Sequence, residues 1–238
     1  MSTPELSIVI PIHNEVESLP HLFPELYDVL VSLSQPFEIL CVDDGSTDRS
    51  FEVLLEWQAK LPAIRIIKLC ARSGKTAAMD AGFRKAQGRV VVTLDADLQD
   101  DPDDIPRLLA ELPGYDMVIG WRRRRIDTWL KRLESRIANR FRSYITGDRV
   151  HDIGCFLKVC RKEMLNCIRL YDGMHRFLPI LCELEGGLVK EVPVNHRPRR
   201  FGQSKYGISN RLWRGLYDLM AVRWMQKRRL QYKIEKEC

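Results

Sequence analysis

The chain has 238 residues, 45% of them hydrophobic, and a formal net charge of +6 at pH 7. A chain of this length can bury a sizeable core, and its composition is typical of a globular enzyme. No uninterrupted apolar stretch approaches the roughly 18 residues that a membrane span requires, and no cationic start precedes an apolar run. We therefore expect a cytoplasmic protein without a transmembrane helix.

Charge is distributed unevenly along the chain. Residues 1–115 hold 10 Lys and Arg against 19 Asp and Glu, a net charge of −9, whereas residues 116–238 hold 28 against 13, a net charge of +15. This division suggests that one half handles cations and that the other faces an anionic partner. A solvated basic surface is the simpler alternative for the second half.

Several common types of site are missing from the sequence. There is no GxSxG elbow, no HExxH pair and no CxxC array, which argues against the common hydrolase and zinc classes. The seven cysteines are odd in number and mostly lie in apolar surroundings, so we expect reduced, core-like thiols rather than disulfides. The five histidines are scattered, and each is more readily explained as a structural residue than as a ligand.

Strands and helices alternate in the first half. Short apolar runs predict strands at 6–12, 37–43, 64–69, 90–94 and 115–120, and helical spacing predicts helices at 18–33, 51–57, 73–86 and 103–112. Ser46, Thr47 or Asp48 can cap the second helix. This order predicts a parallel α/β sheet, in which ligands bind beyond the carboxyl ends of the strands. The motifs HNE, VDDGSTD, ARSGK, DADLQDD and WRRRR all lie at those ends.

The pattern changes after Gly120. It predicts a basic helix at 128–145, a strand and a helix within 151–165, a strand within 188–198 and a glycine-containing basic loop at 198–207. From Ile208 the tail is predicted to be helical, with Leu, Trp, Tyr and Met residues on one face. We expect this tail to lie on a membrane surface; the alternative is packing on the protein's own core or on a second subunit.

Six carboxylates follow the strand at 90–94 within ten residues. Asp95 and Asp97 stand two apart where the strand ends, so both can point at one site, and Gln99 adds a neutral oxygen. Such hard ligands suit Mg²⁺ or Mn²⁺, and Mg²⁺ often completes its shell with substrate phosphates, so a nucleoside diphosphate is the natural partner. The alternative is an acidic helix N-terminus. That explanation fits Asp100 to Asp104 better, because negative charge there is favourable and solvated.

Two other loops can bind an anion or a nucleoside. ARSGKT lacks the first glycine of a phosphate-binding P-loop, because position 69 is leucine, but Gly74 and Lys75 still stand at a helix N-terminus that can attract an anion. Asp43 and Asp44 follow the second strand and can accept hydrogen bonds from a base or a ribose. The alternative is that DGS in VDDGSTD is only a turn.

Seven segments together carry a recognisable signature: IVIPIHNE, VDDGSTD, ARSGKTAAMDAGF, VVTLDADLQDDP, MVIGWR, HDIGCFLKVCRKE and RRFGQSKYG. In this order and spacing they resemble the family-2 glycosyltransferases of GT-A fold, specifically the dolichyl-phosphate mannose synthase-like branch that glycosylates polyprenyl phosphates. The resemblance covers residues 6–209. It implies a mostly parallel, Rossmann-like sheet flanked by helices, with a nucleotide-sugar half (1–120), an acceptor half (121–207) and a basic C-terminal helical extension (208–238).

The resemblance also implies roles for individual residues. The resemblance implies that the nucleotide is held by Pro11, Glu15 and Asp44, with Asp43 nearby. It implies that the metal and the diphosphate are bound by Asp95, Asp97 and Gln99. The lipid phosphate would be received by Arg122, Arg132, Ser135 and Arg136, and a loop that closes over the site would contain Arg199, Ser204 and Lys205. Two positions depart from the family. His13 stands where a tyrosine that stacks on the base is common, and Ser73 stands where asparagine is common.

The chemistry of a lipid phosphate fits this pattern. A phosphate monoester is already an anionic nucleophile at neutral pH, so the protein must mainly hold two mutually repelling anions, which arginines and a metal can do. We therefore expect a metal-dependent, inverting transferase that uses a UDP- or GDP-linked sugar. It would work at the inner, cytoplasmic face of the membrane as a peripheral protein, alone, as a homo-oligomer or with a membrane-protein partner.

Two rival functions remain. A transferase of the same fold with a saccharide or protein acceptor is the closer one. The other is a non-enzymatic binder of nucleic acid or of anionic membranes that uses the basic second half. Because that rival does not explain DADLQ at a strand end, we do not expect nucleic acid as a partner.

Overall fold

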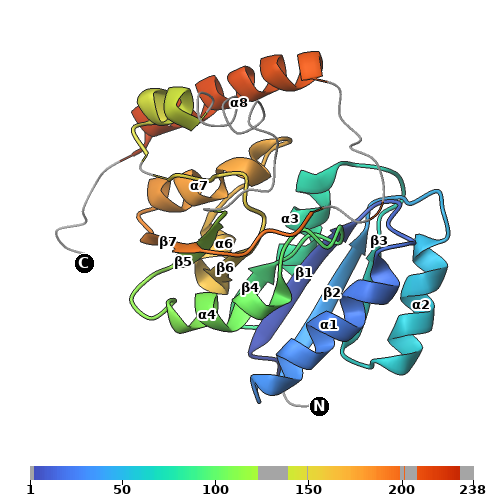
Figure 1. Cartoon of the computed structure of the whole chain (residues 1–238). Coiled ribbons are helices and arrows are strands. Elements are labelled where there is room, and N and C mark those ends of the chain that lie inside the picture. The colour runs from blue at the N-terminus through green and yellow to red at the C-terminus, as the bar shows by residue number, and fades with distance from the viewer. Residues whose placement is uncertain (1–2, 123–138, 149, 199–200, 202–207, 231–238) are drawn as a thin grey trace, which may run out of the picture.

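The structure is a computed structural model that describes residues 3–122, 139–148, 150–198, 201 and 208–230. Its centre is a seven-stranded sheet with the order β3-β2-β1-β4-β6-β5-β7 (Figure 1). The strands are β1 (Leu6–Ile12), β2 (Phe37–Asp43), β3 (Ile64–Lys68), β4 (Val90–Thr93), β5 (Met117–Trp121), β6 (Lys158–Arg161) and β7 (Val189–Pro193). The pairs are parallel except those of β6, which runs antiparallel to both β4 and β5.

Helices cover both faces of the sheet. One face carries α1 (Leu19–Ser32), α2 (Ser50–Lys60), the 3₁₀ turn η1 (Pro102–Asp104) and α4 (Ile105–Ala110). The other carries α3 (Lys75–Lys85), α6 (Lys162–Cys167), the 3₁₀ turn η2 (Met174–Phe177), α7 (Leu178–Leu184) and α8 (Ile208–Arg228). Residues 139–146 form a further helix, which lies beside α8 at the top of Figure 1.

Each face of the sheet has its own hydrophobic core. Leu22 and Leu26 of α1 and Leu108 of α4 pack into the first cluster, and Met79 of α3 and Leu181 of α7 pack into the second. The central strands are almost continuously buried, because helices shield them on both sides. Their ends at the loops therefore provide the exposed polar edge of the sheet.

The predicted fold class is confirmed: the sheet is mostly parallel, it is flanked by helices, and a helix follows it at the C-terminal end. The seven predicted strands are all present. The described part of the predicted basic helix, 139–145, is helical. Within the described residues, no helix has the length and apolar character needed to cross a membrane.

Two local predictions need correction. The helix predicted at 103–112 begins as the 3₁₀ turn η1, and its α-helical part spans only Ile105–Ala110. Of the three residues predicted to cap α2, only Asp48 contacts its start, by accepting the N–H of Ser50 at 2.9 Å. The side chains of Ser46 and Thr47 bond instead to the loop after β1, because that loop folds over them.

Candidate active site

The carboxylate of Asp44 ties the loop after β2 to the start of α3. Its Oδ1 accepts the N–H of Ser73 at 2.6 Å, and its Oδ2 accepts the N–H of Gly74 at 2.9 Å. Gly74 has a φ of +94°, which residues with a side chain rarely adopt. Asp44 itself is buried. The N–H of Gly74 is thus already bonded to Asp44 in this structure, and the anion site at Gly74 and Lys75 stays a prediction.

Asn14 locks the loop after β1 onto the loop after β2. It has a φ of +55°, a left-handed conformation in which asparagine is common among non-glycine residues. Its Oδ1 accepts the N–H of Thr47 at 2.8 Å, and its own N–H donates to Oγ of Ser46 at 3.0 Å. The motifs HNE and VDDGSTD, which are about 30 residues apart in the sequence, therefore form one continuous polar surface. Asn14 was not predicted as a site residue.

The neighbours of Asn14 join the same surface. Nδ1 of His13 lies 2.9 Å from the carbonyl oxygen of Asp44, which can only accept, so Nδ1 is the donor. The N–H of Glu15 donates to Oγ of Ser50 at 2.8 Å, and Oγ of Ser18 donates to the carboxylate of Glu15 at 3.1 Å. These bonds fix His13 and Glu15 at the edge where a nucleotide was predicted.

Asp43 presents a buried oxygen to this edge. Its Oδ1 accepts the N–H of Ser46 at 3.0 Å. Its Oδ2 is also buried, and among the described residues it has no hydrogen-bond partner. Leaving a buried acceptor without a donor costs free energy, so a ligand N–H or O–H would be favourable at this position. Pro11, the remaining predicted nucleotide residue, lies one strand away in β1, opposite Val42.

The DADLQ loop places two carboxylates beside the start of α3. Nζ of Lys75 lies 2.5 Å from Oδ1 of Asp95. Asp97 is buried, and its Oδ1 accepts the N–H of Gln99 at 3.1 Å. Between them Leu98 has a φ of +61°, which turns the backbone sharply. The three predicted metal ligands thus come from one tight turn at the end of β4.

This donor set suits a divalent ion that arrives with its nucleotide. No group of three or more His, Cys, Asp or Glu side chains in the described part of the chain is arranged to hold a metal ion. Asp95, Asp97 and Gln99 supply two carboxylates and an amide oxygen, which are hard donors for Mg²⁺ or Mn²⁺. An ion here would compete with Lys75 for Asp95 and would draw its remaining ligands from a diphosphate.

Asp100 and Asp104 are buried, so the prediction that both are solvated is wrong. Burial, followed by the negative charge of Asp95, raises the pKa of Asp100 to about 7. Its Oδ2 has no hydrogen-bond partner among the described residues. Asp104 accepts the N–H of Asn195 at 2.6 Å and pairs with Arg107 at 2.7 Å, while burial raises its pKa. The segment after β7 covers both carboxylates, which the local sequence could not show.

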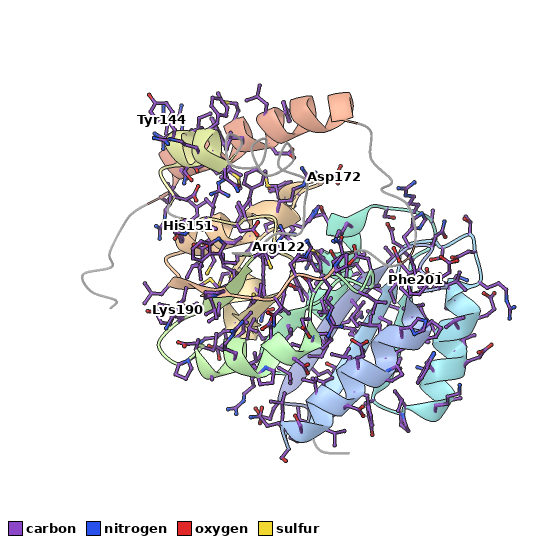
Figure 2. All side chains as sticks on the ribbon, in the orientation of Figure 1. Arg122, Tyr144, His151, Asp172, Lys190 and Phe201 are labelled. Carbon is purple, nitrogen blue, oxygen red and sulfur yellow. The ribbon has the colours of Figure 1, made fainter. Side chains whose placement is uncertain are left out.

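Arg122 follows β5 and is held by a carboxylate from another loop. Its Nε and Nη2 donate to the two oxygens of Asp152 at 2.7 and 2.9 Å. Burial disfavours the charged guanidinium, but the hydrogen bonds and charge of Asp152 outweigh this, so the pKa of Arg122 lies above its ordinary value. Arg122 lies near the centre of the view in Figure 2 and is partly buried. The bidentate pair keeps it charged and oriented.

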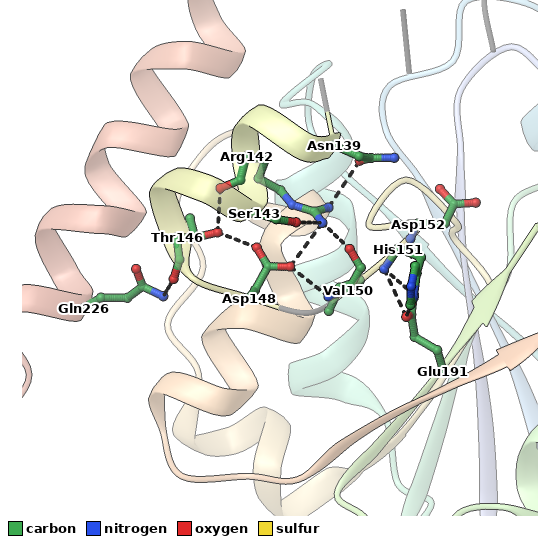
Figure 3. Close-up of polar contacts among 10 residues, drawn as sticks. All are labelled: Asn139, Arg142, Ser143, Thr146, Asp148, Val150, His151, Asp152, Glu191 and Gln226. Atoms are coloured by element: carbon green, nitrogen blue, oxygen red, sulfur yellow. Dashed lines mark hydrogen bonds and ion pairs between the residues drawn. The ribbon is translucent and has the colours of Figure 1, made fainter. Parts of the chain in front are cut away.

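Asp152 is itself fixed by Glu191 of β7. The carboxylate of Glu191 accepts the N–H of Asp152 at 3.1 Å and the N–H of His151 at 2.9 Å (Figure 3). The ring of His151 also stacks on Trp121, with 4.8 Å between ring centroids. The HDIG motif therefore has a structural purpose that the sequence did not show: it supplies and positions the carboxylate partner of Arg122.

The chain after β7 runs beside the DADLQDD loop. The N–H of Arg197 donates to the carbonyl of Gln99 at 3.0 Å, and its Nη2 donates to Asp101 at 2.8 Å. Four residues later, Phe201 stacks on His21 of α1, with 5.2 Å between ring centroids. The predicted acceptor and closing-loop residues Arg132, Ser135, Arg136, Arg199, Ser204 and Lys205 lie outside the described residues.

Two basic side chains near these loops, one buried and one partly buried, were not predicted. Lys158 of β6 is fully buried and donates to the carbonyl of Cys155, and burial lowers its pKa. Nδ1 of His175 lies 2.7 Å from Oγ1 of Thr76, and burial, with the positive charge of Lys75 next, lowers its pKa to about 2. A lysine inside the apolar run GCFLKVC was the only available signal for Lys158. The surroundings of His175 form only when η2 meets α3.

Comparison with known proteins identifies the class. Residues 7–169 match the model of glycosyl transferase family 2. The chain is 38% identical over 229 residues to the dodecaprenyl-phosphate galacturonate synthase of Rhizobium johnstonii, which covers 94% of this chain and 68% of the relative. The chain therefore belongs to glycosyltransferase family 2 and is a glycosyltransferase. The family resemblance carried by its motifs is confirmed.

Solved structures of similar fold support the architecture. Glucosyl-3-phosphoglycerate synthase from Mycobacterium tuberculosis, in complex with Mn²⁺, UDP and phosphoglyceric acid, has a TM-score of 0.69 and 18% identity over 96% of this chain and 80% of that chain. S. aureus TarS in complex with UDP-GlcNAc has a TM-score of 0.66 and 17% identity over 96% and 68% of the two chains. At these identities the likeness establishes the GT-A fold alone.

Proposed function

We propose that the protein transfers a sugar from a nucleoside diphosphate sugar to a polyprenyl phosphate. The observation that carries this proposal is the gathering of opposite charges at one edge of the sheet. Buried Asp100 has the negative charges of Asp95 and Asp97 and the positive charges of Lys75 and Arg122 among its neighbours. An acidic loop suited to a metal and a diphosphate thus stands beside a fixed arginine suited to a second anion.

The donor would bind across the loops after β1, β2 and β4. The buried Oδ2 of Asp43 can accept a hydrogen bond from a base or a ribose, and His13 and Glu15 lie on the same surface. Asp95, Asp97 and Gln99 would hold Mg²⁺ or Mn²⁺ with the diphosphate. The ion, when bound, would neutralise charge on the departing diphosphate. Two solved structures of this fold contain UDP with Mn²⁺ or Mg²⁺, which supports this part of the proposal.

The acceptor would bind on the side of Arg122. A phosphate monoester is a sufficient nucleophile at neutral pH, so the protein needs to orient it rather than to deprotonate it. Asp152 occupies Nε and Nη2 of Arg122, and the remaining Nη1 can face a phosphate oxygen. Direct attack on the anomeric carbon would invert it. The relative named for a dodecaprenyl-phosphate product supports a polyprenyl acceptor.

The location follows from the acceptor. A polyprenyl phosphate keeps its chain in the bilayer, so the enzyme would work as a peripheral protein at the membrane surface, on the inner face where nucleotide sugars are made. The predicted acceptor residues Arg132, Ser135 and Arg136 and the closing-loop residues Arg199, Ser204 and Lys205 belong to this proposal on the family resemblance alone.

A release assay tests the proposal. Purified protein would be incubated with UDP- and GDP-linked sugars, a detergent-solubilised polyprenyl phosphate, and either Mn²⁺ or excess chelator. We expect nucleoside diphosphate release only when metal and lipid phosphate are both present. Release with a saccharide or protein acceptor, and none with the lipid phosphate, would establish the rival function instead.

Two variants of one loop sharpen this assay. Asp97→Asn keeps the shape of the side chain but removes a ligand charge, so we expect a loss of transfer of at least about 100-fold and weaker Mn²⁺-dependent nucleotide binding. Asp103→Asn, an exposed carboxylate in the same acidic run, is the matched control and should retain activity. Calorimetry showing the same metal and nucleotide affinity in Asp97→Asn as in the wild type would refute the assignment of this ligand.

A further inference from the structure

Helix α8 has two apolar faces. Leu219 and Val222 are buried in the second core cluster, so the helix packs on the protein's own core. Tyr217, Met220 and Trp224 recur at helical spacing on another face, where they are 78%, 56% and 64% exposed. Packing on the core, the alternative to membrane contact for this tail, therefore accounts for only one of the two faces.

The helix at 139–146 extends the exposed face of α8. Phe141 and Tyr144, three residues apart, are 51% and 87% exposed. Nε2 of Gln226 in α8 donates to the carbonyl of Thr146 at 2.9 Å, which joins the two helices. Tyr144 lies at the periphery in Figure 2, next to α8. We call Phe141, Tyr144, Tyr217, Met220 and Trp224 the aromatic face.

A buried polar network holds this surface in shape. Nη2 of Arg142 lies 3.1 Å from Oδ1 of Asp148, and both side chains are almost wholly buried. Asp148 also accepts the hydroxyl of Thr146 and the N–H of Val150 (Figure 3). Because Arg142 is turned inward, the outer side of the helix is left to Phe141 and Tyr144.

Positive charge borders the aromatic face. Arg140, Lys227 and Arg228 are exposed, and Arg223 is partly exposed. Among the described side chains of the two helices, the one carboxylate is Asp218, which is partly buried and lies against Gly173. The border of this surface is therefore cationic, which complements anionic lipid headgroups.

Exposed hydrophobic residues on other elements of the described structure do not gather in this way. Val31 of α1, Leu55 of α2 and Leu188 before β7 are 51%, 46% and 59% exposed, but they come from separate elements. Single exposed side chains of that kind are normal on soluble proteins. A contiguous patch with aromatic residues and a cationic border is the pattern of an interfacial helix, in which tyrosine and tryptophan lie at headgroup depth.

We propose that the aromatic face docks the protein on an anionic lipid bilayer, with α8 and the helix at 139–146 lying together in the interface. This inference rests on the proposed function, because a polyprenyl phosphate acceptor requires an enzyme at the bilayer surface. The surface that contacts the membrane then includes a second helix, at 139–146, which is far from the C-terminal tail in the sequence.

Vesicle flotation tests the proposal. Wild-type protein should float with vesicles that contain phosphatidylglycerol, less so as salt is raised, and little with phosphatidylcholine alone. The double variant Tyr144→Ser with Trp224→Ser should lower the partition coefficient by at least about tenfold, because binding scales with the apolar area inserted. Point substitutions are preferable to deletion of α8, because deletion would also uncover the core beneath Leu219 and Val222.

The control is the double variant Leu55→Ser with Leu188→Ser, which removes two exposed apolar side chains elsewhere and should float like the wild type. Both variants should keep the wild-type melting temperature within a few degrees. If the aromatic-face variant floats like the wild type, the proposal is wrong. It is also wrong if wild-type protein does not float and light scattering shows a dimer that the variant loses, since the face would then be a subunit contact.

Measurements of enzyme activity distinguish a failure of membrane docking from a failure of the proposed function. With a short-chain polyprenyl phosphate in detergent, the aromatic-face variant should keep wild-type release of nucleoside diphosphate within about twofold, whereas with the acceptor in vesicles its rate should fall in proportion to binding. Flotation that depends on the aromatic face, with no activity on either acceptor, would support docking and refute only the polyprenyl acceptor.

Discussion

The two sides of the site are held by different kinds of interaction. On the nucleotide side, carboxylates and an amide mainly accept backbone N–H groups: Asp44 bonds to Ser73 and Gly74, and Asn14 bonds to Thr47. The ion pair of Lys75 with Asp95 is an exception. On the acceptor side, charged side chains pair with one another: Arg122 pairs with Asp152, and Arg142 pairs with Asp148.

This difference has a consequence for ligands. Hydrogen bonds from neutral N–H groups add no positive charge, so carboxylates that are held in this way can still attract a cation. An arginine that is paired with one carboxylate keeps a fixed direction and free N–H groups, so the acceptor side can bind an anion without a search through side-chain conformations. In the proposed function, the uneven distribution of charge along the sequence would correspond to two neighbouring sites, one for a cation with its nucleotide and one for an anionic acceptor.

The largest effect on stability should come from breaking a pair on the acceptor side. Asp148→Ala leaves the buried guanidinium of Arg142 without its counter-ion, so we expect a loss of about 3–5 kcal/mol in the free energy of unfolding. Asn14→Ala, which removes hydrogen bonds on the nucleotide side, should cost only about 1–3 kcal/mol. Urea denaturation measures both.

A second substitution at the same site provides the control. Arg142→Met combined with Asp148→Leu replaces both charges by apolar side chains, and should recover most of the stability that Asp148→Ala loses. If Asn14→Ala were as costly as Asp148→Ala, or if the double variant were no better than the single one, the two sides would not differ in the way described.

The same contrast explains how much the sequence could predict. The strands, the DADLQ turn and the carboxylates after β2 depend on residues close together in the chain, so apolar runs and loop motifs were sufficient to find them. Asp100 forms a backbone bridge with His196, 96 residues further along the chain, and the partner of Arg122 is 30 residues away. Such long-range contacts leave no pattern in the local sequence, because the residues around a loop aspartate do not show whether its carboxylate is solvated or paired with an arginine.

The prediction for Arg122 tests whether the paired arginine serves the acceptor. Arg122→Ala should lower kcat/KM for the lipid phosphate by about 100-fold, mainly through KM, and leave nucleotide-sugar affinity within a few fold. Asp152→Asn should produce a smaller change of the same kind, because the arginine remains but loses its orientation.

Non-additivity distinguishes positioning from a general structural effect. Because Asp152 acts through Arg122, the double variant Arg122→Ala with Asp152→Asn should be little worse than Arg122→Ala alone. Asp152→Glu, which keeps the charge, should recover part of the activity lost in Asp152→Asn. If Arg122→Ala lost affinity for the nucleotide sugar while its kinetics with the lipid phosphate were unchanged, the assignment of Arg122 to the acceptor would be wrong.

The smallest expected effect concerns His175, which joins the two sides by its contact with Thr76 of α3. Its charged neighbours Lys75, Arg176 and Lys158 are all positive, and with burial as the first cause they lower the pKa of His175 to about 2. The native state therefore keeps this imidazole neutral, whereas the unfolded state takes up a proton below about pH 6.5. The resulting stability is fully present above that pH and is lost as the pH falls, by roughly 1.4 kcal/mol per pH unit.

A comparison of two proteins isolates this contribution from those of other groups. His175→Asn keeps a polar atom near the position of Nδ1 but cannot take up a proton, so its stability relative to the wild type should improve by about 1.6 kcal/mol between pH 6.5 and pH 5. Urea denaturation at half-unit steps of pH would measure the difference. Parallel stability curves for the two proteins would mean that His175 is protonated in the native state. The protonated ring of His175 would then add a fourth positive charge beside Lys75, Arg176 and Lys158, and the partial burial of the ring opposes this.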